Sequence, residues 1–241
     1  MEWMRPIVLW IHLAAGFTGL AVFWIPALTR KGGGAHRLWG RVFAYCTYLV
    51  SASALVAVAH RFWSAEGALD PQRHGFMFLL GCLALNALAL MRQAVRVSQT
   101  RRDPAAIRTP FHLGLAAACI AGSVACLYLA YVNRQGPFLL FLFMGSIGFS
   151  VGGEILRYAY RAGRRAQDWF FAHMEATLGA GTAFHTAFAV FGLNRLFDLG
   201  DLGGWGLLPW IVPGVVGTAA QKLWERHYRR RFAQGAGRAA A

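Results

Sequence analysis

Residues 111–132 read FHLGLAAACIAGSVACLYLAYV, an apolar run that contains no Asp, Glu, Lys or Arg. A helix needs about 20 residues to cross the roughly 30 Å hydrocarbon core of a bilayer, and this run is long enough. Its apolar residues are not confined to one helical face, as they are in the amphipathic helix of a soluble protein. The run therefore predicts a membrane-spanning helix.

Three similar apolar runs precede this one and three follow it, so the chain is predicted to cross the membrane about seven times. The last run contains Pro209, Pro213 and Gly217. Spanning helices tolerate proline and glycine when neighbouring groups form hydrogen bonds with the backbone groups that these residues leave unpaired. The predicted fold class is all-α: a polytopic membrane helical bundle in one domain, residues 1–233, with a disordered tail at 234–241. The other six predicted spans are 6–28, 42–60, 75–91, 137–156, 170–193 and 205–224.

The composition agrees with a membrane protein. Hydrophobic residues make up 57% of the chain and charged residues only 14%, against about 25% charged in soluble domains. The net charge of +14 would suggest nucleic acid in a soluble protein, but no nucleic-acid-binding motif accompanies it. We predict the lipid bilayer as the partner and no nucleic acid. The four cysteines all fall within apolar runs without CxxC spacing, which predicts neither a disulfide framework nor a zinc site.

The basic residues predict the orientation of the chain. Most of the 24 Lys and Arg residues lie after the first, third and fifth runs and in the C-terminal tail. Loops rich in Lys and Arg stay in the cytoplasm. We therefore expect an outer N-terminus, a cytoplasmic C-terminus and an odd number of spans. Basic loops of this kind are typical of the bacterial cytoplasmic (inner) membrane.

Histidines within the predicted spans are the main candidates for chemistry, because polar side chains inside a membrane are costly. At 1.5 Å per residue, His12 and His185 lie about 9 and about 12 Å from the outer ends of their spans, while His112 and His173 lie near the cytoplasmic ends. Two imidazoles from different helices at one depth suit the axial positions of haem iron, or a transition metal. We predict these two pairs as ligands of haem b in an electron-transfer protein that meets a quinone or redox partner. Because twelve residues separate His173 from His185, they lie about 120° apart around one helix, which disfavours two stacked haems.

The first basic loop, residues 31–41, reads KGGGAHRLWGR. Glycine N–H groups and clustered cationic donors bind anions. We expect Lys31, Arg37 and Arg41 to meet a haem propionate, and we include His36 among the cofactor-binding residues. A lipid headgroup would fit equally well, and a tight turn whose charges only set the orientation is the simpler alternative.

Glu175 lies in the most polar predicted span, near its cytoplasmic end. It is either a catalytic proton acceptor beside His173 or a carboxylate paired with a basic interfacial residue. The first possibility supports an alternative function, a proton-coupled transporter or channel that uses Glu175, His173 and His185 as a relay. A second alternative is a non-catalytic assembly or scaffold protein. No GxSxG, P-loop, GxGxxG or HExxH motif of a soluble enzyme is present.

Two smaller motifs concern packing. Glu154 precedes Arg157 by three residues, a spacing that predicts an ion pair at the end of a helix. Gly148 and Gly152 form a GxxxG motif, which predicts close helix packing either within the chain or between subunits.

The sequence around the first loop resembles a family of bacterial multi-pass membrane proteins of unknown function. The resemblance rests on His12, Lys31-Gly32-Gly33 and the element HR-x-x-GR, which runs from His36 to Arg41 and is followed by Phe43. It covers the first two spans and implies a membrane location and a bundle of seven or eight helices, but no activity. The chain resembles the b-type cytochrome bundles only loosely, because it lacks their spacing of thirteen or fourteen residues between histidines on one helix.

Overall fold

The structure, a computed structural model, describes residues 4–64, 70–134, 138–161, 165–197 and 203–239. These residues form helices and no β-strand, which confirms the all-α class. Short 3-10 turns (Pro104–Ile107 and Gly203–Leu207) and one π-helical turn (Phe188–Gly192) join or extend the α-helices. The α-helices are α1 (Met4–Val22), α2 (Trp24–Leu28), α3 (Gly34–Trp63), α4 (Pro71–Gln99), α5 (Pro110–Val132), α6 (Phe138–Tyr160), α7 (Asp168–Ala187), α8 (Leu193–Phe197) and α9 (Leu208–Ala239).

Five helical segments are long and apolar enough to cross a bilayer. The sixth and seventh predicted spans correspond to α7 and α9, which fall outside this group. His173, Glu175 and several threonines make α7 more polar, and the second half of α9 is rich in arginine. The apolar helices therefore indicate a multi-pass membrane protein. The total of seven spans stays a prediction. The five segments are Pro6–Leu28, Gly34–Trp63, His74–Gln99, Pro110–Val132 and Phe138–Tyr160.

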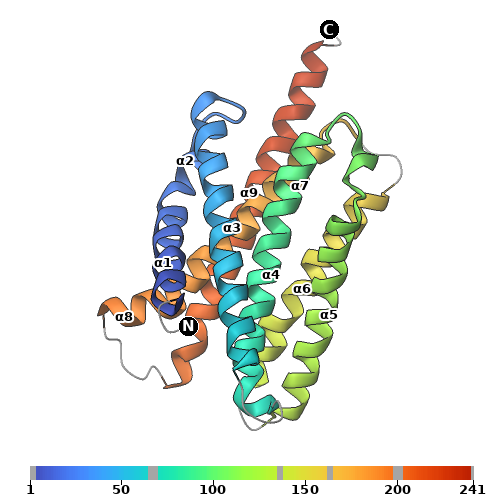
Figure 1. Ribbon diagram of the computed structural model, residues 1–241. Helices are drawn as coiled ribbons and strands as arrows, with labels where there is room; N and C mark the ends of the chain where they lie inside the picture. The colour runs from blue at the N-terminus through green and yellow to red at the C-terminus, as the bar shows by residue number, and fades with distance from the viewer. Residues whose placement is uncertain (1–3, 65–69, 135–137, 162–164, 198–202, 240–241) are drawn as a thin grey trace.

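The basic connections come together at one end of the bundle (Figure 1). This end, which we call the basic end, contains the α2–α3 turn, the α4–α5 connection, the start of α7 and the C-terminal half of α9. α3 begins at Gly34 and α4 ends at Gln99, so both helices extend farther toward the basic end than the predicted spans 42–60 and 75–91. Its cytoplasmic location stays a prediction. α9 remains helical to Ala239, which includes most of the segment predicted to be disordered, and residues 240 and 241 lie outside the described residues.

The GxxxG motif packs α6 against α5 within the same chain. A Cβ atom at Gly148 would meet the carbonyl oxygen of Cys119, and one at Gly152 would meet that of Ala116. The hydroxyl of Ser123 donates to the carbonyl of Gly145 across the same interface, at 2.5 Å. Small residues allow two helix backbones to approach closely in a membrane. Of the two alternatives left open by the sequence, the structure shows packing within the chain.

Candidate cofactor site at the basic end

The turn between α2 and α3 positions His36. Gly32 has a φ of +76°, a left-handed conformation that glycine adopts without steric cost. The N–H of Gly33 then donates to the carbonyl of Arg30 at 3.0 Å, and α3 begins at Gly34. Because the chain reverses so tightly, His36 in the first turn of α3 lies beside the end of α2.

His36 meets His173 of α7 at the basic end. The two ring centroids lie 6.2 Å apart, with an angle of 67° between the ring planes. The Nδ1 atom of His36 lies 3.0 Å from the carbonyl oxygen of Pro26, and that of His173 lies 2.8 Å from the carbonyl oxygen of Ala94. The structure thus pairs two predicted site residues from helices that are distant in the sequence.

These hydrogen bonds determine which ring nitrogen of each histidine is available. A carbonyl oxygen only accepts, so Nδ1 must donate its proton in both residues. In a neutral imidazole, Nε2 then keeps its lone pair. Histidines that ligate a metal are held in this way, with the non-ligating nitrogen donating to a carbonyl or carboxylate. Both rings are therefore oriented as metal ligands or as hydrogen-bond acceptors.

Lys31 places a positive charge beside the two rings. Its Nζ atom donates to the carbonyls of Pro26 and Ala27, at 2.9 and 2.5 Å. It also lies 5.4 Å from the centroid of the Trp224 ring of α9. Burial lowers the pKa of Lys31 from its ordinary value. The ammonium group interacts electrostatically with His36 and His173, so an anionic group would be favoured here. Arg37 and Arg41 are exposed on α3.

Three phenylalanine rings pack together deeper in the bundle, seven residues after His36 on α3 and eleven residues after His173 on α7. Phe43 of α3 is only 1% exposed. Its ring centroid lies 5.3 Å from that of Phe23 and 5.3 Å from that of Phe184 of α7. The cluster therefore lies about 10 to 17 Å along the helices from the histidine pair.

The predicted pair of His12 and His185 is not brought together. The Nδ1 atom of His12 lies 2.9 Å from the hydroxyl oxygen of Ser53. The ring of His185 instead packs against Phe23 and Trp24, with centroid distances of 5.5 and 5.3 Å. Phe23 follows His12 by eleven residues, so the two histidines lie at levels about 17 Å apart along α1.

The predicted pair of His112 and His173 lies on two sides of α4. His112 is fully buried, and its Nε2 atom lies 2.8 Å from the Oε1 atom of Gln93. His173 contacts the next residue, Ala94, from α7. The two histidines therefore approach the same level of α4 but do not face each other. Thr109 helps to position His112 by accepting from its backbone N–H, at 3.3 Å.

Glu175 faces away from the histidine pair, toward α6 and α9. Its charged neighbours are Glu154 and Arg157 of α6 and Glu225 and Arg229 of α9. Each of these glutamates forms an ion pair with the arginine on its own helix, which confirms the predicted pair of Glu154 and Arg157. The relay that joins Glu175 to His173 is not assembled in this arrangement.

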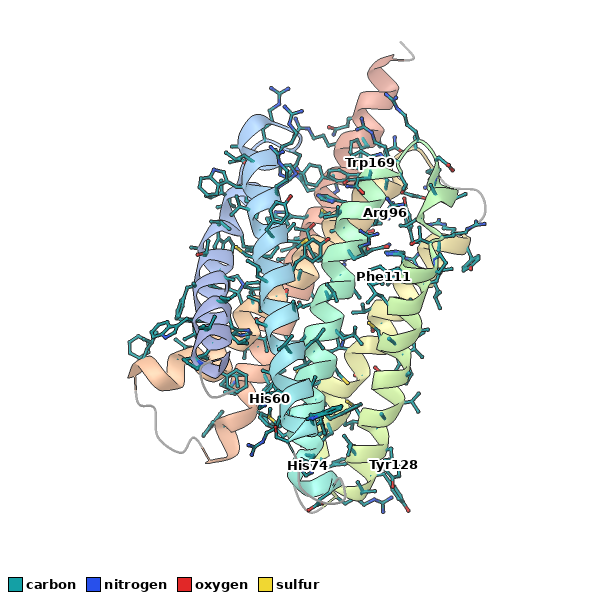
Figure 2. The ribbon with its side chains drawn as sticks, viewed as in Figure 1. His60, His74, Arg96, Phe111, Tyr128 and Trp169 are labelled. Carbon is teal, nitrogen blue, oxygen red and sulfur yellow. The ribbon has the colours of Figure 1, made fainter. Side chains whose placement is uncertain are left out.

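Other histidines lie at the opposite end of the bundle. Figure 2 shows His60 and His74 there, far from Trp169 and Arg96 at the basic end. The hydroxyl of Ser64 donates to the carbonyl of His60 at 2.8 Å, and His74 contacts the backbone of Asp70. Among the described residues, no group of three or more His, Cys, Asp or Glu side chains could hold a metal ion.

The sequence does not predict the pairing of His36 with His173, although it carries a signal for it. The predicted spans place His36 in a loop, so its depth in the membrane could not be counted along a helix. In the structure α3 begins before His36, so His36 and His173 both lie in the first two turns of helices that start at the basic end. If the second predicted span had started at the loop glycines, His36 and His173 would have been placed at the same depth.

Scans against protein-family models, curated proteins and solved structures return no significant match. The resemblance of the first loop to uncharacterised bacterial membrane proteins therefore stays a prediction.

Proposed function

We propose that this membrane protein binds a haem at the basic end, where His36 and His173 would hold its iron, and that it takes part in electron transfer. The observation that carries the proposal is the pairing of the two rings. Their centroids lie 6.2 Å apart, and each Nδ1 atom donates to a backbone carbonyl, so both Nε2 atoms would be available to hold an iron.

The number of protein ligands also favours a haem over a bare metal ion. A porphyrin would supply four nitrogens to its iron, so the protein would need to contribute only one or two more ligands. A structural metal ion such as Zn²⁺ takes about four protein ligands. The Nε2 atoms of His36 and His173 would provide two ligands, which suits a haem better than a bare metal ion. The absence of a CxxCH attachment motif favours a haem held without covalent bonds, as in b-type haems.

The surrounding residues fit this role. Lys31 would attract a propionate. When bound, a haem supplies reversible one-electron chemistry. The protein contributes the orientation of His36 and His173 through the carbonyls of Pro26 and Ala94. Its membrane location suits a quinone or a membrane-bound redox partner.

The test is the absorption spectrum of the full chain, purified in detergent after expression with added haem precursor. We expect a Soret band that is lost or reduced at least about tenfold in His36→Ala and in His173→Ala. The variants His12→Ala and His185→Ala are matched controls, because each removes a membrane histidine outside the pair. A colourless protein, or a band that depends on His12 and His185 instead, would overturn the proposal.

The proton relay is less well supported, because Glu175 and His173 point toward different helices. A relay protein would be colourless and would show pH-dependent flux in liposomes that is sensitive to Glu175→Gln.

A further inference from the structure

A groove runs along the side of the bundle between α6 and α9. α9 packs against α7 and leaves a hollow of about 520 Å³ beside α6. The groove is apolar along its length, and Lys222 is the one charged side chain among the described residues that line it. Its lining includes Phe143 and Ile147 of α6 and Ile211, Val215, Ala219 and Lys222 of α9.

The contacts of α9 with α7 explain why this face stays uncovered. A Cβ atom at Gly217 would meet the side chain of Thr182, so the two helices approach closely there. Nearer the basic end, the ring centroids of Phe170 and Tyr228 lie 4.9 Å apart. Gly217 and Tyr228 are eleven residues apart on one face of α9, and the groove residues lie on another. Val215 on the groove face is 62% exposed.

The length of the groove matches one leaflet of a bilayer. From Ile211 to Lys222 it covers about 16 Å of helix, and half of the hydrocarbon core is about 15 Å. Trp210 closes the far end, because it is buried and packs against Phe76 and Phe191 with centroid distances of 6.2 and 5.8 Å. Trp210 therefore closes the groove at the level of Phe76, five residues from the start of α4, and the groove opens toward the basic end.

A basic hollow of about 580 Å³ lies on the next stretch of α9. Its lining begins at Leu223, the residue after Lys222. Clustered Lys and Arg at the end of a spanning helix attract anionic lipid headgroups, and arginine binds phosphate through parallel hydrogen bonds. The hollow is lined by Leu223, Arg226, His227, Arg230, Arg231 and Gln234.

We propose that the groove and the basic hollow together bind one anionic phospholipid. Its acyl chains lie between α6 and α9 with their ends toward Trp210, and its phosphate meets Lys222 and Arg226. The length of the apolar groove matches that of an acyl chain in one leaflet. The positive charge at its open end matches the anionic headgroup. This site is separate from the histidine pair and does not depend on a haem.

The experiment measures lipid binding to the delipidated full chain in detergent by native mass spectrometry. The probes are phosphatidylglycerol and phosphatidylcholine with identical acyl chains. We expect the anionic lipid to bind at least about tenfold more tightly. Replacing either Lys222 or Arg226 by glutamine should reduce this preference by about fivefold, and replacing both should abolish it. The matched control Arg101→Gln/Arg102→Gln, which removes two charges at the same end but away from α9, should leave the preference unchanged.

A second pair of variants tests the acyl part of the site. Ala219→Trp should fill the groove and weaken binding of both lipids, and Val215→Phe should do the same if Ala219→Trp does not fold. Equal affinity for the two lipids would overturn the proposal, and so would an equal loss of preference in the Arg101 and Arg102 control. Complete competition by glycerol phosphate at the same concentration would show a free phosphate site instead. Co-purification of a partner helix that blocks both lipids would show a protein interface.

Discussion

The Nε2 atom of His112 lies 2.8 Å from the Oε1 atom of Gln93, and the pair is fully enclosed between α5 and α4. His112 lies on the first turn of α5 and Gln93 near the end of α4. The interaction therefore joins two neighbouring helices by a buried polar contact.

Removing the glutamine should destabilise the bundle. Gln93→Leu leaves Nε2–H of His112 buried without an acceptor, which costs about 1–3 kcal/mol. Denaturant unfolding in detergent, followed by circular dichroism, should show the loss. Gln99→Leu, at the exposed end of the same helix, is the control and should change stability by less than about 0.5 kcal/mol. Equal stability of both variants would show that the buried contact contributes nothing.

The glycines of α6 should differ in their tolerance of a side chain. A Cβ atom at Gly148 would meet backbone and side-chain atoms of α5, whereas none lies within 4 Å of one at Gly153. Overpacking a tight contact costs about 1–3 kcal/mol. We therefore expect Gly148→Val to lower the unfolding midpoint in detergent and Gly153→Val to have little effect. The close packing between α5 and α6 would be disproved if Gly153→Val were the more damaging change.

The residues that would hold the haem iron should determine its redox potential. Methionine in place of one axial histidine raises the potential of a haem. His173→Met should therefore keep the cofactor and shift the midpoint potential upward in a spectroelectrochemical titration. His185→Met, outside the pair, should leave the potential unchanged. An unaltered potential in His173→Met would remove His173 from the ligand set.

Glu175 should be dispensable for the proposed electron transfer. Its charged neighbours lie on α6 and α9, so Glu175→Gln should leave both the Soret absorbance and the midpoint potential unchanged. Glu225→Gln tests the same charged region from α9. If Glu175→Gln abolished a pH-dependent ion flux in liposomes while the protein was colourless, the transport alternative would be correct.

The number of spans can be measured by labelling single cysteines in a variant that lacks the four native ones. With seven spans, a cysteine at Gln167 should react from the same side as one at Arg102, and a cysteine at Trp205 from the opposite side. Ser64→Cys serves as the reference for that opposite side. Labelling of Gln167 and Trp205 from one side would mean that α7 does not cross the membrane.

Much of the fold follows from local sequence. The apolar run at 111–132 is long and uncharged enough to form α5 in any context that provides lipid, and the Thr109-Pro110 start of that helix is equally local. The Glu154–Arg157 pair also depends only on helical spacing. The boundaries of α3 and α4 were less predictable, because interfacial arginines and histidines continue a helix beyond its apolar part.

The sequence by itself determined that this chain is a bundle of apolar helices with its basic connections at one end, because hydrophobic length and charge placement act on each segment separately. Only the tertiary structure decided that His36 meets His173, that α4 separates His173 from His112, and that His12 and His185 lie at different levels. Depth along a helix can be counted from residue numbers, but the neighbour of a side chain depends on which helices pack together and how each is rotated. That rotation is set by contacts such as Gly148 against Cys119 and Gly217 against Thr182, which join residues far apart in the chain.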